Sequence, residues 1–113
     1  METILVVDDD PAVRAMLSLS LRQAGFRVDT AADGDEALAL LERAAYEALL
    51  TDLAMSPMDG LELARQARAR RPSLRIALVT ALVTAFAEEQ GAADACFTKP
   101  PAVEAIVGWL GRA

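Results

Sequence analysis

Residues 4–11 read ILVVDDDP, a short apolar run followed by three aspartates and a proline. A continuous run rich in β-branched residues is typical of a strand buried on both faces of a parallel sheet. Asp10 has a side chain suited to the N-cap of a helix, and Pro11 fits the first helical position, where no amide donor is lost. The segment therefore predicts a buried strand at residues 4–7 that leads directly into a helix.

The same alternation of apolar runs and helical segments continues to the end of the chain. Val13, Leu17 and Leu21 recur at helical spacing, and Gly25 follows where that helix is expected to end. We expect further strands at residues 26–30, 48–51, 76–79 and 95–98, and helices at residues 11–24, 37–44, 61–70, 84–90 and 102–110.

Five strands that alternate with five helices predict an α/β fold in which a parallel sheet carries helices on both faces. The 113 residues, 54% of them hydrophobic, are enough for a single domain over residues 1–113. Cys96 is the only cysteine, which excludes an internal disulfide and suits a reducing compartment. The sequence has neither a signal-peptide pattern nor an apolar stretch of about 20 residues, so we expect a cytoplasmic protein without a membrane partner.

Charge and composition exclude several classes of function. The formal net charge of −6 repels nucleic-acid phosphates, so we expect no direct nucleic-acid partner. Histidine is absent, which excludes histidine acid–base catalysis, histidine-ligated zinc and a phosphohistidine on this chain. The acidity itself is explained either by solubility or by a cation site built from some of the carboxylates.

Polar side chains follow four of the five predicted strands. Asp8 and Asp9 come after the first strand, Asp52 after the third, Thr80 at the end of the fourth and Lys99 after the fifth. The carboxyl ends of parallel strands meet at one edge of a sheet, so we expect these side chains to lie together. Clustered carboxylates repel one another unless a cation intervenes, and an all-oxygen set favours Mg²⁺. A carboxylate in such a site can attack a phosphoryl group and form an aspartyl-phosphate.

Each of these residues also has an ordinary structural explanation. The acidic triplet at residues 8–10 is consistent with a solvated turn and a helix cap, and Asp52 with a loop cap. Thr80 is consistent with an ordinary strand position and Lys99 with a surface charge. These explanations would have to hold together at four strand ends, so we favour a single site.

Four segments in this order and spacing resemble the receiver domain of two-component response regulators, over essentially the whole chain. They are ILVVDDDP at 4–11, LLTDLAMSPMDGLEL at 49–63, ALVTA at 77–81 and FTKP at 97–100. The resemblance implies a doubly wound fold of five βα units with strand order 2-1-3-4-5. It also implies that the protein is not an enzyme toward other molecules, because a receiver catalyses only its own phosphorylation and dephosphorylation.

The resemblance assigns a role to each residue at the strand ends. Asp52 matches the phosphorylated aspartate, Thr80 the hydroxyl that moves toward the phosphoryl group, and Lys99 the lysine that binds it. Asp8 and Asp9 match the acidic pair of the family, and Asp9 is favoured over Asp8 as the direct metal ligand. The implied ligands of Mg²⁺ are Asp8, Asp9, Asp52 and the backbone carbonyl of Ala54.

The resemblance also implies partners. The phosphoryl donor would be a phosphohistidine on a sensor histidine kinase or a phosphotransfer protein. Phosphorylation would draw Thr80 inward and repack the face formed by the fourth helix, the fifth strand and the fifth helix. That face would bind a downstream protein target or a second copy of the chain. A cis peptide between Lys99 and Pro100 is expected as well.

Two departures from the family's usual pattern affect the loops. Ser56 stands where the family usually has proline, and Pro57 follows it, which leaves open the path of the loop that carries Ala54. The segment between Thr80 and Lys99 is shorter than usual by about three residues, which predicts a shortened fourth helix.

A third departure affects the switch. Cys96 stands where the family usually has the aromatic partner of the switch hydroxyl. Phe97 is adjacent, but strand side chains alternate, so it should point into the core on the other face. Thr84 offers a rival to Thr80, because VTA occurs at residues 79–81 and again at 83–85; we prefer Thr80, which ends the buried run.

Two other functions are compatible with parts of the sequence. A phosphorylation-independent pseudo-receiver that only binds proteins would explain the altered switch face, but it has no chemical need for the acidic set and Lys99. A hydrolase that forms an aspartyl-phosphate usually has a second aspartate two residues after the nucleophile, where this chain has Ala54.

Overall fold

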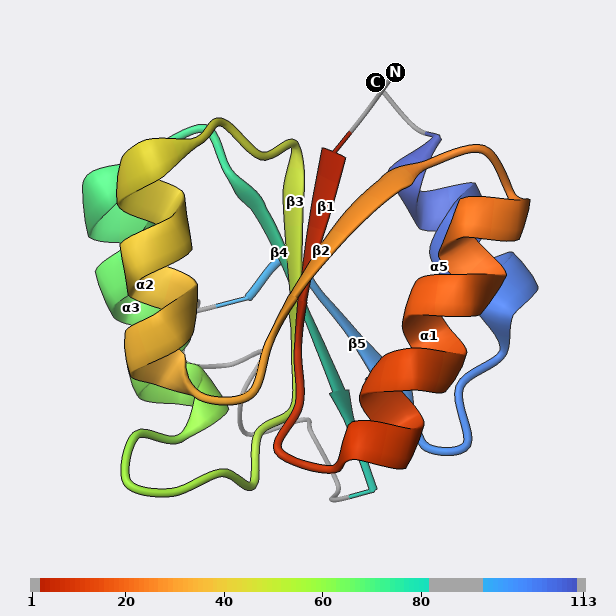
Figure 1. Cartoon of the computed structure of the whole chain (residues 1–113), viewed down its shortest axis with the longest axis horizontal. Helices are drawn as coiled ribbons and strands as arrows, with labels where there is room; N and C mark the ends of the chain where they lie inside the picture. The colour runs from red at the N-terminus through yellow and green to blue at the C-terminus, as the bar shows by residue number, and fades with distance from the viewer. Residues whose placement is uncertain (1–2, 82–92, 112–113) are drawn as a thin grey trace.

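The computed structural model describes residues 3–81 and 93–111, and its elements follow the predicted alternation (Figure 1). The strands are β1 (Thr3–Val7), β2 (Arg27–Ala31), β3 (Ala48–Thr51), β4 (Arg75–Thr80) and β5 (Ala95–Thr98). The helices are α1 (Pro11–Gln23), α2 (Gly34–Arg43), α3 (Gly60–Arg70) and α5 (Val103–Leu110). The predicted fourth helix at residues 84–90, and with it the rival Thr84, lies outside the described residues.

All five strands are parallel and form one sheet in the order β2-β1-β3-β4-β5, as the resemblance implied. In the register of the central strands, Leu5 pairs with Asp29 of β2 on one side and with Leu49 of β3 on the other. The chain runs outward from β1 to β2 and then crosses back to β3. The order therefore reverses between β1 and β3, and the crevice beyond the carboxyl ends of these strands is where open α/β sheets bind ligands.

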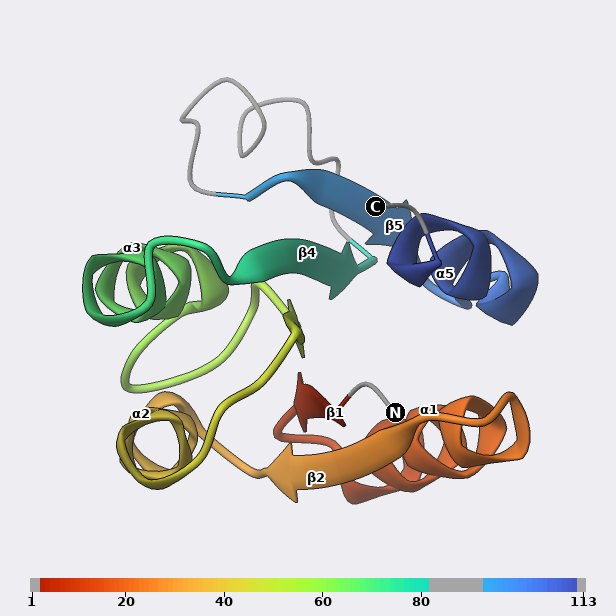
Figure 2. The same cartoon turned by 90° about the horizontal axis from the view of Figure 1, so that it is seen from above.

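Helices cover both faces of the sheet, with α2 and α3 on one face and α1 and α5 on the other (Figure 2). Strand side chains alternate between two separate cores. Leu5 and Val7 of β1 pack into the core under α2 and α3, whereas Ile4 and Val6 pack into the core under α1 and α5. Every residue of β3 is buried, which explains why the central strands are continuous apolar runs in the sequence.

Aspartate side chains begin three of the helices. The side chains of Asp10, Asp33 and Asp59 accept hydrogen bonds from the main-chain N–H groups of Ala12, Glu36 and Glu62. These bonds satisfy N–H groups that have no partner within the helix.

The end of α1 differs slightly from the prediction. Gly25 has a φ of 102°, a left-handed conformation that favours glycine. The N–H of Phe26 donates to the carbonyl of Leu21 at 3.1 Å, so Phe26 closes the end of the helix. As a result β2 begins at Arg27, one residue later than predicted.

Candidate functional site

Four strand ends bring the predicted polar residues to the lower edge of the sheet as drawn in Figure 1. Asp8 follows β1 and Asp52 follows β3, and the N–H of Asp52 donates to the carbonyl of Val7 at 3.0 Å. Thr80 ends β4, and its carbonyl accepts the N–H of Lys99 at 3.0 Å. The backbone ladder thus continues one residue beyond the strands and fixes the main chain of the site.

Lys99 lies between the carboxylates of two different strand ends. Its Nζ is 2.8 Å from Oδ2 of Asp8 and 3.1 Å from Oδ2 of Asp52. The side chains are largely removed from water, with exposures of 19% for Lys99, 2% for Asp8 and 9% for Asp52. Charge-assisted hydrogen bonds in such surroundings are stronger than surface ion pairs.

The carboxylates also control the protonation of the amine. Burial by itself would lower the pKa of Lys99, but the hydrogen bonds and negative charges of Asp8 and Asp52 outweigh it, and the pKa is raised above its ordinary value. Lys99 is therefore a fixed positive charge at neutral pH.

Three carboxylates form a cluster, and two of them bond this lysine. One oxygen from each of Asp8, Asp9 and Asp52 lies within 4.8 Å of the others. Asp8 and Asp52 are buried and Asp9 is exposed. This all-oxygen donor set, open to water on one side, fits a hard divalent cation that keeps several waters, as Mg²⁺ does.

The two oxygens of Asp8 are both engaged by the protein. Oδ1 accepts the N–H of Asp10 at 2.9 Å, and Oδ2 accepts Lys99. The side chain of Asp9 takes part in neither of these two bonds, and it is exposed. The acidic pair therefore consists of one carboxylate fixed inside the site and one at its entrance.

The backbone of Asp52 is held from two sides. The hydroxyl of Thr51 donates to the carbonyl of Asp52 at 3.0 Å, and this pair is buried. Gly60 packs against the same carbonyl so closely that a Cβ at this position would lie 2.1 Å from the oxygen. Only glycine fits this approach without displacing the main chain.

The loop that follows Asp52 has a defined path. The N–H of Ala54 donates to Oδ1 of Asp52 at 3.4 Å, and Ala54 itself is exposed. The peptide between Ser56 and Pro57 is cis. The loop closes where the N–H of Gly60 donates to the carbonyl of Leu53 at 2.9 Å. The shifted proline is thus accommodated in the loop, and Ala54 stays beside Asp52.

The fifth strand confirms the predicted orientation of its side chains. Phe97 packs into the core under α1 and α5, where its ring lies 6.1 Å from that of Trp109 in an edge-to-face arrangement. Cys96 is partly buried and packs on the opposite face, against the core under α2 and α3. The peptide between Lys99 and Pro100 is cis, as expected.

Arg14 contacts the site but was not predicted. Its Nη1 donates to the backbone carbonyl of Asp8 at 2.7 Å. A signal was present in the sequence, because α1 has no acidic residue in its first turn and carries Arg14 close to its N-terminus. The helix dipole disfavours a cation there while the carboxylates of residues 8–10 attract one, so the position draws attention to Arg14 but does not identify its partner.

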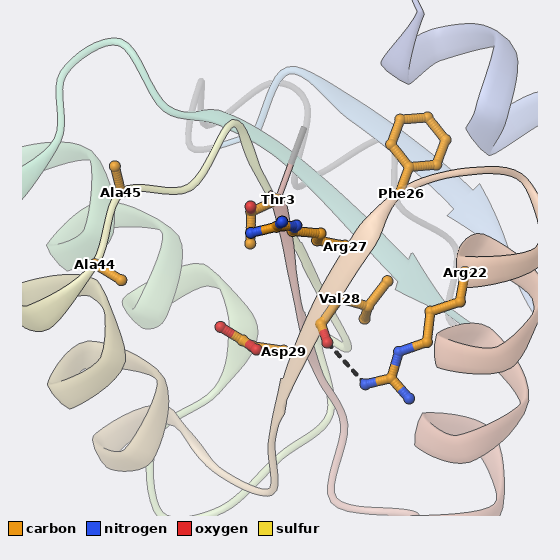
Figure 3. Close-up of a pocket in the computed structure, with 8 residues that line it drawn as sticks. All are labelled: Thr3, Arg22, Phe26, Arg27, Val28, Asp29, Ala44 and Ala45. Carbon is orange, nitrogen blue, oxygen red and sulfur yellow. Dashed lines mark hydrogen bonds between the residues drawn. The ribbon is translucent and has the colours of Figure 1, made fainter. Parts of the chain in front are cut away.

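A pocket in the described part of the chain lies at the opposite edge of the sheet and contains none of these residues (Figure 3). It is an open hollow around the start of β2. Its lining residues are Thr3, Arg22, Phe26, Arg27, Val28, Asp29, Ala44 and Ala45.

Comparison with known proteins identifies the family. Residues 4–109 match the response regulator receiver domain. The chain is 40% identical over 107 residues to the response regulator MprA of Mycobacterium leprae, and the matched region covers 92% of this chain and 47% of MprA. It is 33% identical over 108 residues to the probable transcriptional regulatory protein TcrX of Mycobacterium tuberculosis, covering 93% of this chain and 46% of TcrX. The chain thus spans about half the length of these relatives.

Solved structures agree with this result. The chemotaxis protein CheY4 of Vibrio cholerae superposes with a TM-score of 0.90 at 31% identity, covering 97% of this chain and 96% of CheY4. The response regulator TrrA of Thermotoga maritima, solved in complex with Mg²⁺-BeF, gives a TM-score of 0.87 at 32% identity, and the superposition covers 97% of this chain and 99% of TrrA. The chain belongs to the response regulator receiver domain family. Among the described helices, none has the length and apolar character needed to cross a bilayer.

Proposed function

We propose that the chain is a phosphoacceptor receiver domain over residues 1–113, in which Asp52 takes a phosphoryl group from a phosphohistidine. The donor would be a sensor histidine kinase or a phosphotransfer protein, and the domain would work in the cytoplasm. Family membership and the lone cysteine support this setting. The protein would not act as an enzyme on other molecules.

One observation carries the proposal: a single partly buried ammonium joins the buried carboxylates of Asp8 and Asp52 at the switch point of the sheet. Here the described carboxylates outnumber the ammonium, so the site keeps an excess of negative charge that suits a divalent cation.

The residues present fit Mg²⁺. Asp9 and Asp52 would bind it directly together with the backbone carbonyl of Ala54. Asp8, whose oxygens accept the N–H of Asp10 and the ammonium of Lys99, would contribute through its charge and through water. When bound, the ion supplies Lewis-acid neutralisation of the phosphoryl oxygens.

In the transfer step, a carboxylate oxygen of Asp52 attacks the phosphorus atom, a new O–P bond forms, and the P–N bond to the donor imidazole breaks. The electron pair of that bond stays on the imidazole nitrogen, and no proton needs to leave Asp52. Lys99 holds its positive charge beside the nucleophile and, as a donor of three hydrogen bonds, can also reach a phosphoryl oxygen.

The resulting phosphoryl group would act on the end of β4 and β5. Thr80 is buried at the end of β4 and would bind the group through its hydroxyl. The surface that responds would include β5 and α5, and it would bind a downstream protein or a second copy of the chain. The helix expected to complete this surface lies outside the described residues.

The test is incubation with Mg²⁺ and acetyl phosphate, followed by intact-protein mass spectrometry. We expect the mass of one phosphoryl group to be added to the wild-type chain and to Glu36→Gln, a surface control, and not to Asp52→Asn. Addition that requires Mg²⁺ and Asp52 supports the proposal. Absence of any addition would favour a protein-binding module that does not use phosphate.

A further inference from the structure

We propose that Arg14 is a positioning residue for the cation site, because it fixes the peptide that joins Asp8 to Asp9. The inference rests on the proposed function, since it concerns the site in which Mg²⁺ would bind. Arg14 would not touch the cation or the phosphoryl group. It would act through the backbone of the acidic pair.

The contacts of Asp8 carry the argument. Its N–H donates to the carbonyl of Ala31 at 3.3 Å, its two carboxylate oxygens accept Asp10 and Lys99, and its carbonyl accepts Arg14 at 2.7 Å. The carbonyl of Asp8 and the N–H of Asp9 belong to one rigid peptide plane. The bond from Arg14 is thus the contact that sets the orientation of the plane from which Asp9 departs.

The location of Arg14 fits this role better than a general electrostatic one. An arginine in the first turn of a helix lies near the positive end of the helix dipole, which is unfavourable. A cation next to a cation site also opposes binding of the metal. The nearby carboxylates of Asp8 and Asp9 attract a guanidinium, yet among the described residues Arg14 bonds the carbonyl of Asp8 and forms no ion pair with either carboxylate.

A charge role and a positioning role for Arg14 predict opposite effects of its removal on the affinity for Mg²⁺. If Arg14 acts by charge alone, Arg14→Met removes a repulsive charge and Mg²⁺ should bind more tightly. If Arg14 holds the peptide, the same substitution frees the plane and Mg²⁺ should bind more weakly. We expect the dissociation constant to rise about tenfold, the lower end of the effect of losing a group that orients a metal ligand.

The chain supplies a matched control on the same helix. Arg22, in the last turn of α1, donates from Nη2 to the carbonyl of Val28 at 2.8 Å, as Figure 3 shows. Both arginines bond a carbonyl six residues away, and both bonds are partly buried. Arg22→Met should therefore cost comparable stability, but it lies at the opposite end of α1 and should leave Mg²⁺ binding unchanged.

The experiment measures the affinity of the unphosphorylated protein for Mg²⁺ by calorimetry for wild type, Arg14→Met, Arg14→Lys and Arg22→Met, with urea unfolding of each variant. The inference is supported if only Arg14→Met weakens binding and Arg14→Lys, which can still donate to the carbonyl, restores most of it. It is overturned if Arg14→Met binds as tightly as wild type or more tightly, or if Arg22→Met weakens binding equally. If wild type itself binds no Mg²⁺, the proposed function fails too, which separates the two failures.

Discussion

Gly60 is the position where one added carbon atom should disturb the site most. In Gly60→Ala, the new Cβ would lie 2.1 Å from the carbonyl oxygen of Asp52 and 2.9 Å from Cα of Leu53, whereas real Cβ contacts are essentially never shorter than 3.0 Å. Both obstructing atoms belong to the backbone and cannot rotate away. The start of α3 and the Asp52 segment must therefore separate by about 1 Å in a close-packed interior.

The expected cost follows from this displacement. Overpacking of a well-packed site typically lowers the free energy of unfolding by about 1–3 kcal/mol. The higher helix propensity of alanine offsets at most about 1 kcal/mol of that loss. Because Asp52 is the proposed nucleophile, a misplacement of this size should slow phosphorylation by acetyl phosphate by about 100-fold.

Gly108→Ala is the control for this substitution. Gly108 lies inside α5, and a Cβ there meets no described heavy atom within 4 Å, so alanine should stabilise the protein by about 0.5–1 kcal/mol and leave the rate unchanged. Urea unfolding and the rate of mass gain with acetyl phosphate measure both effects. The reasoning is refuted if Gly60→Ala unfolds and reacts like wild type. Lost stability with a normal rate would mean that α3 moves and Asp52 does not.

Two further predictions concern charge and pH. Lys99→Met should lower the free energy of unfolding in EDTA by about 3 kcal/mol, because it leaves two nearly buried carboxylates without their shared ammonium. Mg²⁺ should then stabilise this variant more than wild type, and an unchanged urea midpoint in EDTA would contradict the expectation. Burial, followed by the hydrogen bond to Asp29, raises the pKa of Tyr46 above its ordinary value, so stability should fall as pH rises above about 10, where the unfolded chain loses the phenolic proton first. Tyr46→Phe should lower the free energy of unfolding by about 1 kcal/mol at neutral pH and should lose less stability than wild type as the pH rises, with Lys99 causing the loss that remains. Urea unfolding at about pH 8 and about pH 11 measures this loss, and an equal loss in wild type and Tyr46→Phe would contradict the prediction.

The fold could be predicted because its strongest signals are local. The runs that form β1, β3 and β4 are apolar because both faces of these strands are covered, and Asp10 marks the start of α1. The second helix begins at Gly34, three residues before the predicted range, because Asp33 caps it. The boundary of β2 was missed by one residue because Phe26 donates its N–H to the end of α1. That choice depends on how the helix closes, which a pattern of hydrophobic residues does not contain.

The membership of the site could be predicted from the topology, but its contacts could not. Parallel strands place their carboxyl ends together, so Asp8 and Lys99 meet although 91 residues separate them. Whether the ammonium bonds one carboxylate or two depends on the register and on rotamers. The contact of Arg14 with a backbone carbonyl could not be predicted, because a main-chain acceptor is present at every residue and leaves no pattern in the sequence.

The charge balance at Lys99 shows how the proposed phosphoryl group could reach the rest of the fold. A dianion on Asp52 would compete for an ammonium that already serves two carboxylates, so Lys99 would have to redistribute its hydrogen bonds. The main-chain N–H of Lys99 donates to the carbonyl of Thr80, and Lys99 directly follows β5. Phe97, two residues earlier, packs on Trp109 of α5. In the described part of the chain, a connection from the proposed site to α5 would then run through the backbone at the end of β5, without passing through the side chain of Cys96.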